Sequence, residues 1–123
     1  MDFKSTNLDI SSAPQYGMHV LYFKFKGRFS RAASIEGARA WSEEMESSNN
    51  SYTFVWDCTD MNGFDPSARK QWYQSLKLYK RRITEVTVIA DSFLIRGAAR
   101  VMLEYFGLKS HIVKSLEDIM VSK

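Results

Sequence analysis

The order of hydrophobic and polar positions divides the start of the chain into strands and a turn. Residues 18–26 alternate, with Leu21, Phe23 and Phe25 on one face and mostly polar side chains on the other. A period of two residues is typical of a strand with one buried face. Residues 3–10 form a weaker strand candidate, and a turn follows it.

A helix is expected after this strand, because Ser30 can cap its first turn and apolar residues then recur every three or four positions. The apolar stripe of this helix consists of Ala33, Gly37, Ala40, Trp41 and Met45. Residues 52–56 form a short apolar run rich in aromatic and β-branched side chains, which is typical of a buried central strand. The pattern thus changes from helix to strand near residue 50.

Polar residues follow this strand, and three of them are acids. We expect a loop from Asp57 to Asp65, with Asp60 between them. Asp65 and Pro66 together predict a helix start, because aspartate caps helices and proline is tolerated in the first turn. The expected helix spans residues 66–82. Its buried face consists of Ala68, Trp72, Leu76 and Tyr79.

Another strand and another helix come next. Residues 86–90 form a strand suited to burial on both faces, and Ser92 can cap the helix that follows it. Gly97 lies inside that helix, where we expect it to permit close packing, and Gly107 is typical of the helix end. The apolar stripe of this helix consists of Ile95, Ala98, Ala99, Met102 and Phe106.

The pattern finishes with a short strand over residues 110–113 and a helix that opens at residues 115–118. The order is therefore β-β-α-β-α-β-α-β-α. Strands separated by single helices pair in parallel through crossovers, whereas the first strand or two can pair antiparallel at an edge. We predict an α/β fold with one open, mostly parallel sheet covered by helices and an antiparallel edge strand.

Length and composition narrow the class of protein. The 123 residues predict one domain over 1–123, and a content of 45% hydrophobic and 25% charged residues predicts a packed core. No apolar run approaches the ~20 residues that span a bilayer, and the N-terminus lacks the pattern of a secretory signal. Cys58 cannot form an internal disulfide, because it is the single cysteine. We expect a cytoplasmic protein.

Charge is distributed unevenly along the chain. Residues 1–65 hold six Lys or Arg and nine Asp or Glu, net −3, whereas residues 66–123 hold eleven and five, net +6. Most of the basic excess lies in the expected helix over residues 66–82. Such a run is typical of a solvated helix face, and it is also compatible with an anionic partner. Nucleic acid ranks low among the partners, because the aromatic residues fall mainly on predicted core stripes.

The candidate catalytic groups lack partners in the sequence. His19 and His111 fall on predicted strands away from the three acids, so no acid–base pair and no zinc spacing is present. Cys58 follows a strand with no basic neighbour, which favours a role as a small buried hydrophobe. Gly63 stands alone and forms no glycine-rich phosphate loop. We expect no enzymatic activity, no metal and no cofactor.

The element order and three stretches of sequence resemble the STAS domain of sulphate transporters and anti-sigma factor antagonists. The stretches are Val55–Asp57 followed by Gly63–Arg69, Val86–Ala90, and Leu94–Ala99. The likeness is closest to the stand-alone bacterial group called SpoIIAA-like or STAS/SEC14-like, and it covers nearly the whole chain. It implies a regulatory domain that binds a protein partner.

The resemblance also implies a phosphorylation switch, with one departure. In anti-sigma factor antagonists, a serine that follows an aspartate at a helix start is phosphorylated by a partner kinase. Asp65 matches the aspartate, Pro66 takes the place of the phosphorylated serine, and Ser67 matches the next serine. Ser67 would therefore have to act from one residue further on, or serve only as a capping or solvated residue.

We therefore expect a non-enzymatic regulatory domain that acts through the loop and helix start around residues 57–69. The candidate interaction and switch surface consists of Asp57, Asp65, Ser67, Arg69 and Arg96. Its partner would be another protein, such as a kinase-like regulator, or a second copy of the chain as a homodimer. The alternative is a small binding module that holds a lipid or another apolar ligand under its helices, since an apolar cavity leaves no sequence motif.

Overall fold

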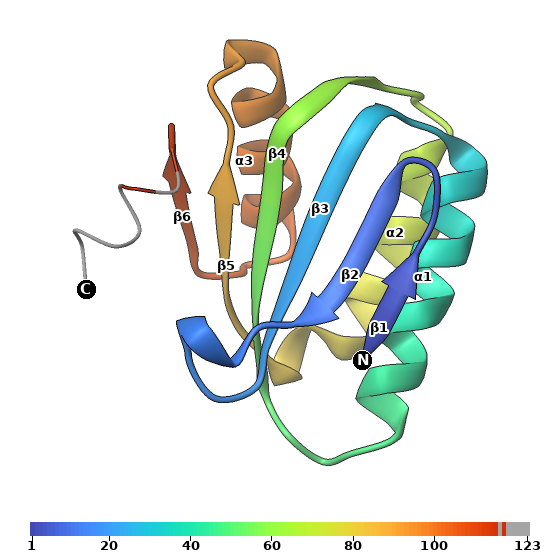
Figure 1. The fold of residues 1–123 in the computed structure, drawn as a ribbon, viewed down its shortest axis with the longest axis vertical. Coiled ribbons are helices and arrows are strands. Elements are labelled where there is room, and N and C mark those ends of the chain that lie inside the picture. The colour runs from blue at the N-terminus through green and yellow to red at the C-terminus, as the bar shows by residue number, and fades with distance from the viewer. Residues whose placement is uncertain (116, 118–123) are drawn as a thin grey trace.

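The chain forms one six-stranded sheet, and three α-helices lie against one of its faces (Figure 1). The computed structural model describes residues 1–115 and 117. The strands are β1 Asp2–Lys4, β2 Leu8–Ser12, β3 Val20–Phe29, β4 Tyr52–Phe64, β5 Ile83–Ile89 and β6 Ser110–Val113. The helices are α1 Arg31–Glu46, α2 Ala68–Tyr79 and α3 Phe93–Tyr105, with short 3-10 turns η1 Pro14–Tyr16 and η2 Lys80–Arg82.

The strands lie in the sheet in the order in which they occur in the chain. β1, β2 and β3 pair antiparallel, whereas β3, β4, β5 and β6 pair in parallel. Each parallel connection passes through a helix, which confirms the predicted α/β fold with a mostly parallel sheet and an antiparallel edge. The expected last helix falls on residues 116 and 118–123, which lie outside the described residues.

Large aromatic side chains fill the space between the sheet and the helices. Trp41 of α1 and Trp72 of α2 pack edge to face, with ring centroids 5.9 Å apart, and both also contact rings of the sheet. Phe23 of β3 and Phe54 of β4 are fully buried beneath them. Each such side chain contributes about 2–3 kcal/mol by leaving water, so this layer holds the helices on the sheet.

The expected strand over residues 3–10 is two strands. Ser5 interrupts it, because its hydroxyl donates to the carbonyl of Leu8 at 2.6 Å and its backbone N–H donates to Asp9. These local bonds compete with strand pairing and turn the chain between β1 and β2. A single long strand was therefore wrong, although both halves belong to the sheet.

The helix ends match the sequence pattern in two of three helices. Ser30 accepts a hydrogen bond from the backbone N–H of Ala33 at 3.1 Å, and Ser92 accepts one from Ile95 at 3.3 Å. Gly107 follows α3 with a φ of +67°, the left-handed conformation that ends many helices. These capping predictions are confirmed.

The remaining helix, α2, is shorter than expected. It begins at Ala68 and not at Pro66, and the carboxylate of Asp65 binds Arg28 in place of the helix N-terminus. The other end is also early, since residues 80–82 form a 3-10 turn. There the Arg82 guanidinium donates to the carbonyls of Met45, at 2.7 Å, and Ser48, at 2.6 Å, behind the end of α1. The predicted span of 66–82 was therefore too long.

The expected loop over residues 57–65 is not a loop. β4 continues to Phe64, because β3 extends beside it and pairs Lys26 with Asp60 and Phe29 with Phe64. Two register shifts in this half of the pair accommodate its irregular sequence. The pairing partner, β3, lies 33–35 residues earlier in the chain, and it decided the structure of a segment whose own composition is typical of loops.

Candidate functional site

The C-terminal half of β4, from Trp56 to Phe64, contributes to a different surface on each face of the sheet. On the helix side, apolar residues of this half line a pocket with α2 and α3. On the opposite face, acids of the same strand form ion pairs with a row of cations on β3. The predicted site residues are distributed between these two surfaces.

The pocket has a volume of about 350 Å³ and is almost entirely apolar. Its floor comes from the sheet and includes Phe25, Phe29, Trp56 and Phe64. Its walls come from α2, with Trp72 and Tyr73, and from α3, with Leu94, Ala98 and Val101. A volume of this size lies at the lower end of the ~300–1,000 Å³ typical of small-molecule sites.

Small residues on α3 leave this space open. Gly97, Ala98 and Ala99 all line the pocket, and none of them has a side chain long enough to fill it. A Cβ atom at Gly97 would meet nothing within 4 Å. The expectation that Gly97 permits close packing is therefore wrong, because its missing side chain widens the pocket.

Apolar side chains are exposed on α3 beside the pocket. Phe93 is 86% exposed, Leu94 71% and Val101 65%, and all three contribute to the lining. Within α3 itself only Ile95 and Leu103 are buried. The helix therefore presents an unusually apolar outer surface for an element that also carries Arg96 and Arg100.

Arg69 lies in the first turn of α2 and lines the pocket. Its side chain is exposed, and no hydrogen bond or ion pair joins it to other residues in the described ranges 1–115 and 117. Arg96 is half-buried on α3 and does not contribute to the lining. The structure therefore places one of the two predicted arginines at the pocket.

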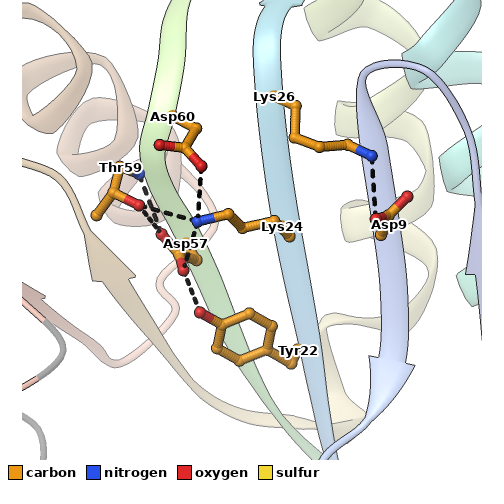
Figure 2. Close-up of polar contacts among 7 residues, drawn as sticks. All are labelled: Asp9, Tyr22, Lys24, Lys26, Asp57, Thr59 and Asp60. Carbon is orange, nitrogen blue, oxygen red and sulfur yellow. Dashed lines mark hydrogen bonds and ion pairs between the residues drawn. The ribbon is translucent and has the colours of Figure 1, made fainter.

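The opposite face of the sheet carries a polar cluster around Lys24, shown in Figure 2. The Lys24 ammonium lies 3.2 Å from Asp57 Oδ2 and 3.1 Å from Asp60 Oδ2, and it donates to the Thr59 hydroxyl at 3.1 Å. The Tyr22 hydroxyl donates to the same Asp57 oxygen. Asp57 is thereby surrounded by donors from β3 and from its own strand.

These contacts decide the ionisation of Asp57. Burial disfavours the charged form, but hydrogen bonds from Tyr22 and Thr59 and the charge of Lys24 outweigh it, so the pKa of Asp57 lies below its usual value. Burial and the adjacent Asp57 raise the pKa of Tyr22. At neutral pH, Asp57 is therefore a carboxylate and Tyr22 a neutral phenol. This arrangement suits a structural role and not general-base catalysis.

Two further ion pairs extend this row across the sheet. Lys26 Nζ lies 3.0 Å from Asp9, and Arg28 Nε lies 2.5 Å from Asp65. Figure 2 shows Lys26 and Asp9 next to the Lys24 cluster. Alternate residues of β3 thus pair with the acids of both neighbouring strands, and the three acids of the expected loop act as cross-strand partners.

Ser67 lies at the exposed turn between β4 and α2. Although it occupies the N-cap position, its side chain makes no capping hydrogen bond. Pro66 beside it is also exposed. Within the described ranges, the Ser67 hydroxyl therefore does not cap the helix. The sequence alone had left open whether Ser67 acts as a cap.

The five predicted surface residues do not form one contiguous site. Asp57 lies on the sheet face opposite the helices, eight residues before Asp65, and a strand of eight residues spans roughly 25 Å. Ser67 and Arg69 are close in the chain at the start of α2, whereas Arg96 lies on α3. We call residues 64–69, which turn from strand into helix, the β4–α2 corner.

Cys58 lines the floor of the pocket and is 5% exposed. Burial and the neighbouring Asp57 raise the pKa of its thiol to about 12. The expected role as a small buried hydrophobe is confirmed, since a thiol with this pKa is not a nucleophile near neutral pH.

Neither histidine lines the pocket or belongs to the polar cluster around Lys24. His19 occupies the turn before β3 with a φ of +59°, and His111 lies on β6 with Nε2 3.3 Å from Glu85. In residues 1–115 and 117, no group of three His, Cys, Asp or Glu side chains could hold a metal ion. None of the helices in these ranges is long and apolar enough to cross a bilayer.

Sequence reasoning allowed an apolar cavity under the helices but did not locate it, and it missed the row of cations on β3. Phe29, Phe64 and Leu94 line the pocket, yet none of them lies on a predicted apolar stripe. The row was visible as the period of two that Lys24, Lys26 and Arg28 share, which predicts a polar sheet face and could have been matched to the nearby acids.

Comparisons with known proteins agree on the fold. No protein-family model and no curated protein matches the chain. An uncharacterized protein of the DUF3478 family with a SpoIIAA-like fold from Shewanella loihica PV-4 has a TM-score of 0.72, with 15% identity over 98% of each chain. The anti-sigma factor antagonist SpoIIAA, in its unphosphorylated form, has a TM-score of 0.68, with 9% identity over 94% of each chain. The chain therefore has the SpoIIAA-like fold that the resemblance of its sequence implied.

Proposed function

We propose that this chain is a non-enzymatic regulatory domain that binds a protein partner through the β4–α2 corner. The observation that carries the proposal is the state of Ser67, whose exposed side chain makes no capping bond at the start of α2. A structural neighbour with the same fold is an anti-sigma factor antagonist described in its unphosphorylated form. A phosphate on Ser67 would lie next to the helix N-terminus and close in sequence to Arg69.

The proposal excludes catalysis because the reactive groups are engaged elsewhere. Asp57, Asp60 and Asp65 are held in ion pairs, and the Cys58 thiol is buried with a pKa of about 12. Nucleophilic chemistry would need the thiol exposed and ionised near neutral pH. A cytoplasmic location belongs to the proposal, since one buried free thiol suits a reducing compartment.

Photo-crosslinking from defined positions tests this interface. A photoreactive amino acid is placed at Ser67 or, as the control, at Arg39, which is exposed on α1. We expect one defined crosslinked protein from position 67 in cells and none from position 39. A product of two copies of the chain would identify a homodimer, and equal crosslinking from both positions would contradict the proposed interface.

Phosphorylation of Ser67 is tested separately. The wild-type protein and Ser67→Ala are incubated with lysate of the source cells and ATP, and phosphopeptides are mapped. We expect phosphate on Ser67 in the wild type and none in the variant. Phosphate confined to other residues would remove the switch from the proposal and leave the interface to the crosslinking result.

A second candidate function is favoured by the pocket between α2 and α3. Its volume of about 350 Å³ and its aromatic floor match a module that holds a small apolar molecule. The two functions are compatible, because the start of α2 contributes both to the β4–α2 corner and to the pocket lining. Mass spectrometry of the protein under native conditions would show a co-purified ligand as a mass increase that organic extraction removes.

A further inference from the structure

We infer that the pocket between α2 and α3 binds a single-chain amphiphile with a carboxylate head group, and that Arg69 binds the carboxylate. This inference deepens the second candidate function and rests on it. It names the ligand class and the residue that recognises it.

The pocket suits an unbranched apolar chain. Phe29, Trp56 and Phe64 supply a floor of aromatic surface, and the small residues of α3 keep the opposite wall open. The exposed rings and methyl groups of Phe93 and Leu94 continue this surface outward. Covering them with a hydrocarbon chain would remove apolar area from water on the ligand and on the protein.

The charge of the lining points to an anionic head. Arg69 is the charged residue among the described side chains that line the pocket, and its guanidinium has no hydrogen-bonding or ionic partner in the ranges 1–115 and 117. The other arginines facing neighbouring elements differ, since Arg28 pairs with Asp65 and Arg82 binds backbone carbonyls. The Arg69 guanidinium therefore has all its N–H donors available to a ligand in the pocket.

One guanidinium matches a carboxylate better than a phosphate. A carboxylate carries one negative charge and two oxygens that fit the fork of arginine. A phosphate monoester carries roughly −1.5 to −2 at neutral pH and would leave charge uncompensated beside an apolar wall. The start of α2 adds the positive end of a helix dipole to the same position.

The exposure of Arg69 sets the orientation of the ligand. Arg69 is exposed, whereas Trp56 and Cys58 on the floor are 4% and 5% exposed. The head group would therefore stay at the mouth in contact with water, and the chain would run toward the sheet. This arrangement requires no buried charge, which would be costly in such an apolar site.

Titration calorimetry with decanoate and decanol, both below their aggregation limits, tests the inference. We expect the wild type to bind decanoate more tightly than decanol. Arg69→Gln should lower decanoate affinity by about three- to tenfold, the range for one charged hydrogen bond at a partly exposed site, and leave decanol unchanged. Lys70→Gln is the matched control, because Lys70 is exposed on the same helix turn and does not line the pocket. It should change neither affinity.

Gly97→Leu locates the binding. Its Cβ has open space, so the variant should fold, which circular dichroism checks, and its side chain should weaken both ligands by filling the pocket. If decanoate and decanol bind equally and respond only to Gly97→Leu, carboxylate recognition is overturned while the apolar-ligand function survives. If the folded wild type binds neither compound, or binds both regardless of Gly97→Leu, the inference and the pocket function both fall.

Discussion

At the scale of single residues, Asp57 shows how an acid suited to catalysis becomes a structural group. Its side chain is 7% exposed, yet it stays ionised because Tyr22, Thr59 and Lys24 surround it with donors. Removing the charge leaves the lysine without its buried partner, which is costlier than losing an exposed pair. The same lysine also pairs with Asp60, which is 65% exposed and offers a direct comparison.

Asp57→Asn should reduce the free energy of unfolding by about 1–2 kcal/mol at pH 7, and Asp60→Asn by less than about 1 kcal/mol. Because the folded-state pKa of Asp57 is lowered, its stabilisation is complete above the unfolded pKa of about 3.9 and is lost as pH falls through the folded value. Urea titrations at pH 7, 4 and 3 should therefore show the difference between wild type and Asp57→Asn shrinking with acidity. If the stability difference between wild type and Asp57→Asn did not change with pH, the charge of the Asp57 carboxylate would not be what stabilises the folded protein.

At the scale of elements, two helical glycines have opposite surroundings. A Cβ at Gly37 of α1 would lie 2.4 Å from the buried Leu8 Cδ2 and 3.4 Å from Trp72 Cζ3, so this glycine lets α1 approach the sheet. At Gly97 of α3 the same atom would meet open space. Sequence alone presents both as glycines inside predicted helices, and only the neighbouring elements distinguish their surroundings.

Gly97→Ala should raise the free energy of unfolding by about 0.5–1 kcal/mol, because alanine favours the helix and nothing opposes it. Gly37→Ala should lower it by about 1 kcal/mol, since overpacking costs roughly 1–3 kcal/mol and exceeds the gain in helix propensity. Thermal or urea unfolding of the two variants side by side measures the contrast. Equal shifts in the same direction would mean that Leu8 repacks freely.

At the scale of the whole molecule, one hydrophobic cluster joins the sheet to all three helices. It includes Trp41 of α1, Trp72 of α2 and Leu103 of α3 together with strand residues such as Phe54. A second, smaller cluster around Val55 and Ile89 lies separately from it. Because the large cluster is continuous, we propose that the chain is a single domain whose elements lose structure together.

Urea unfolding should therefore follow one transition. Tryptophan fluorescence reports on Trp41, Trp56 and Trp72 in the core, and far-ultraviolet circular dichroism reports on the helices. We expect the two signals to give the same midpoint. Separate midpoints would show that a part such as α3, which buries little of its surface, unfolds on its own.

The sequence by itself determined the alternation of strands and helices from β3 to β6, two of the three helix caps and most of the core. These properties depend on local chemistry: the period of apolar residues, the serines at positions 30 and 92, and the left-handed glycine at 107. The open, mostly parallel sheet followed from the order, because strands joined by single helices permit few topologies, whereas the SpoIIAA-like fold was implied by the family resemblance.

Only the tertiary structure decided what the segment after Trp56 becomes and what α2 and α3 enclose. Asp57, Asp60 and Asp65 do not form the expected loop, because cations on β3 lie opposite or near them. No local rule reveals a partner 33–37 residues away in the chain. The pocket likewise depends on the distance between two helices, which side-chain volumes across the whole core set together. Pairing and packing are sums over distant residues, so they appear only when the chain is folded.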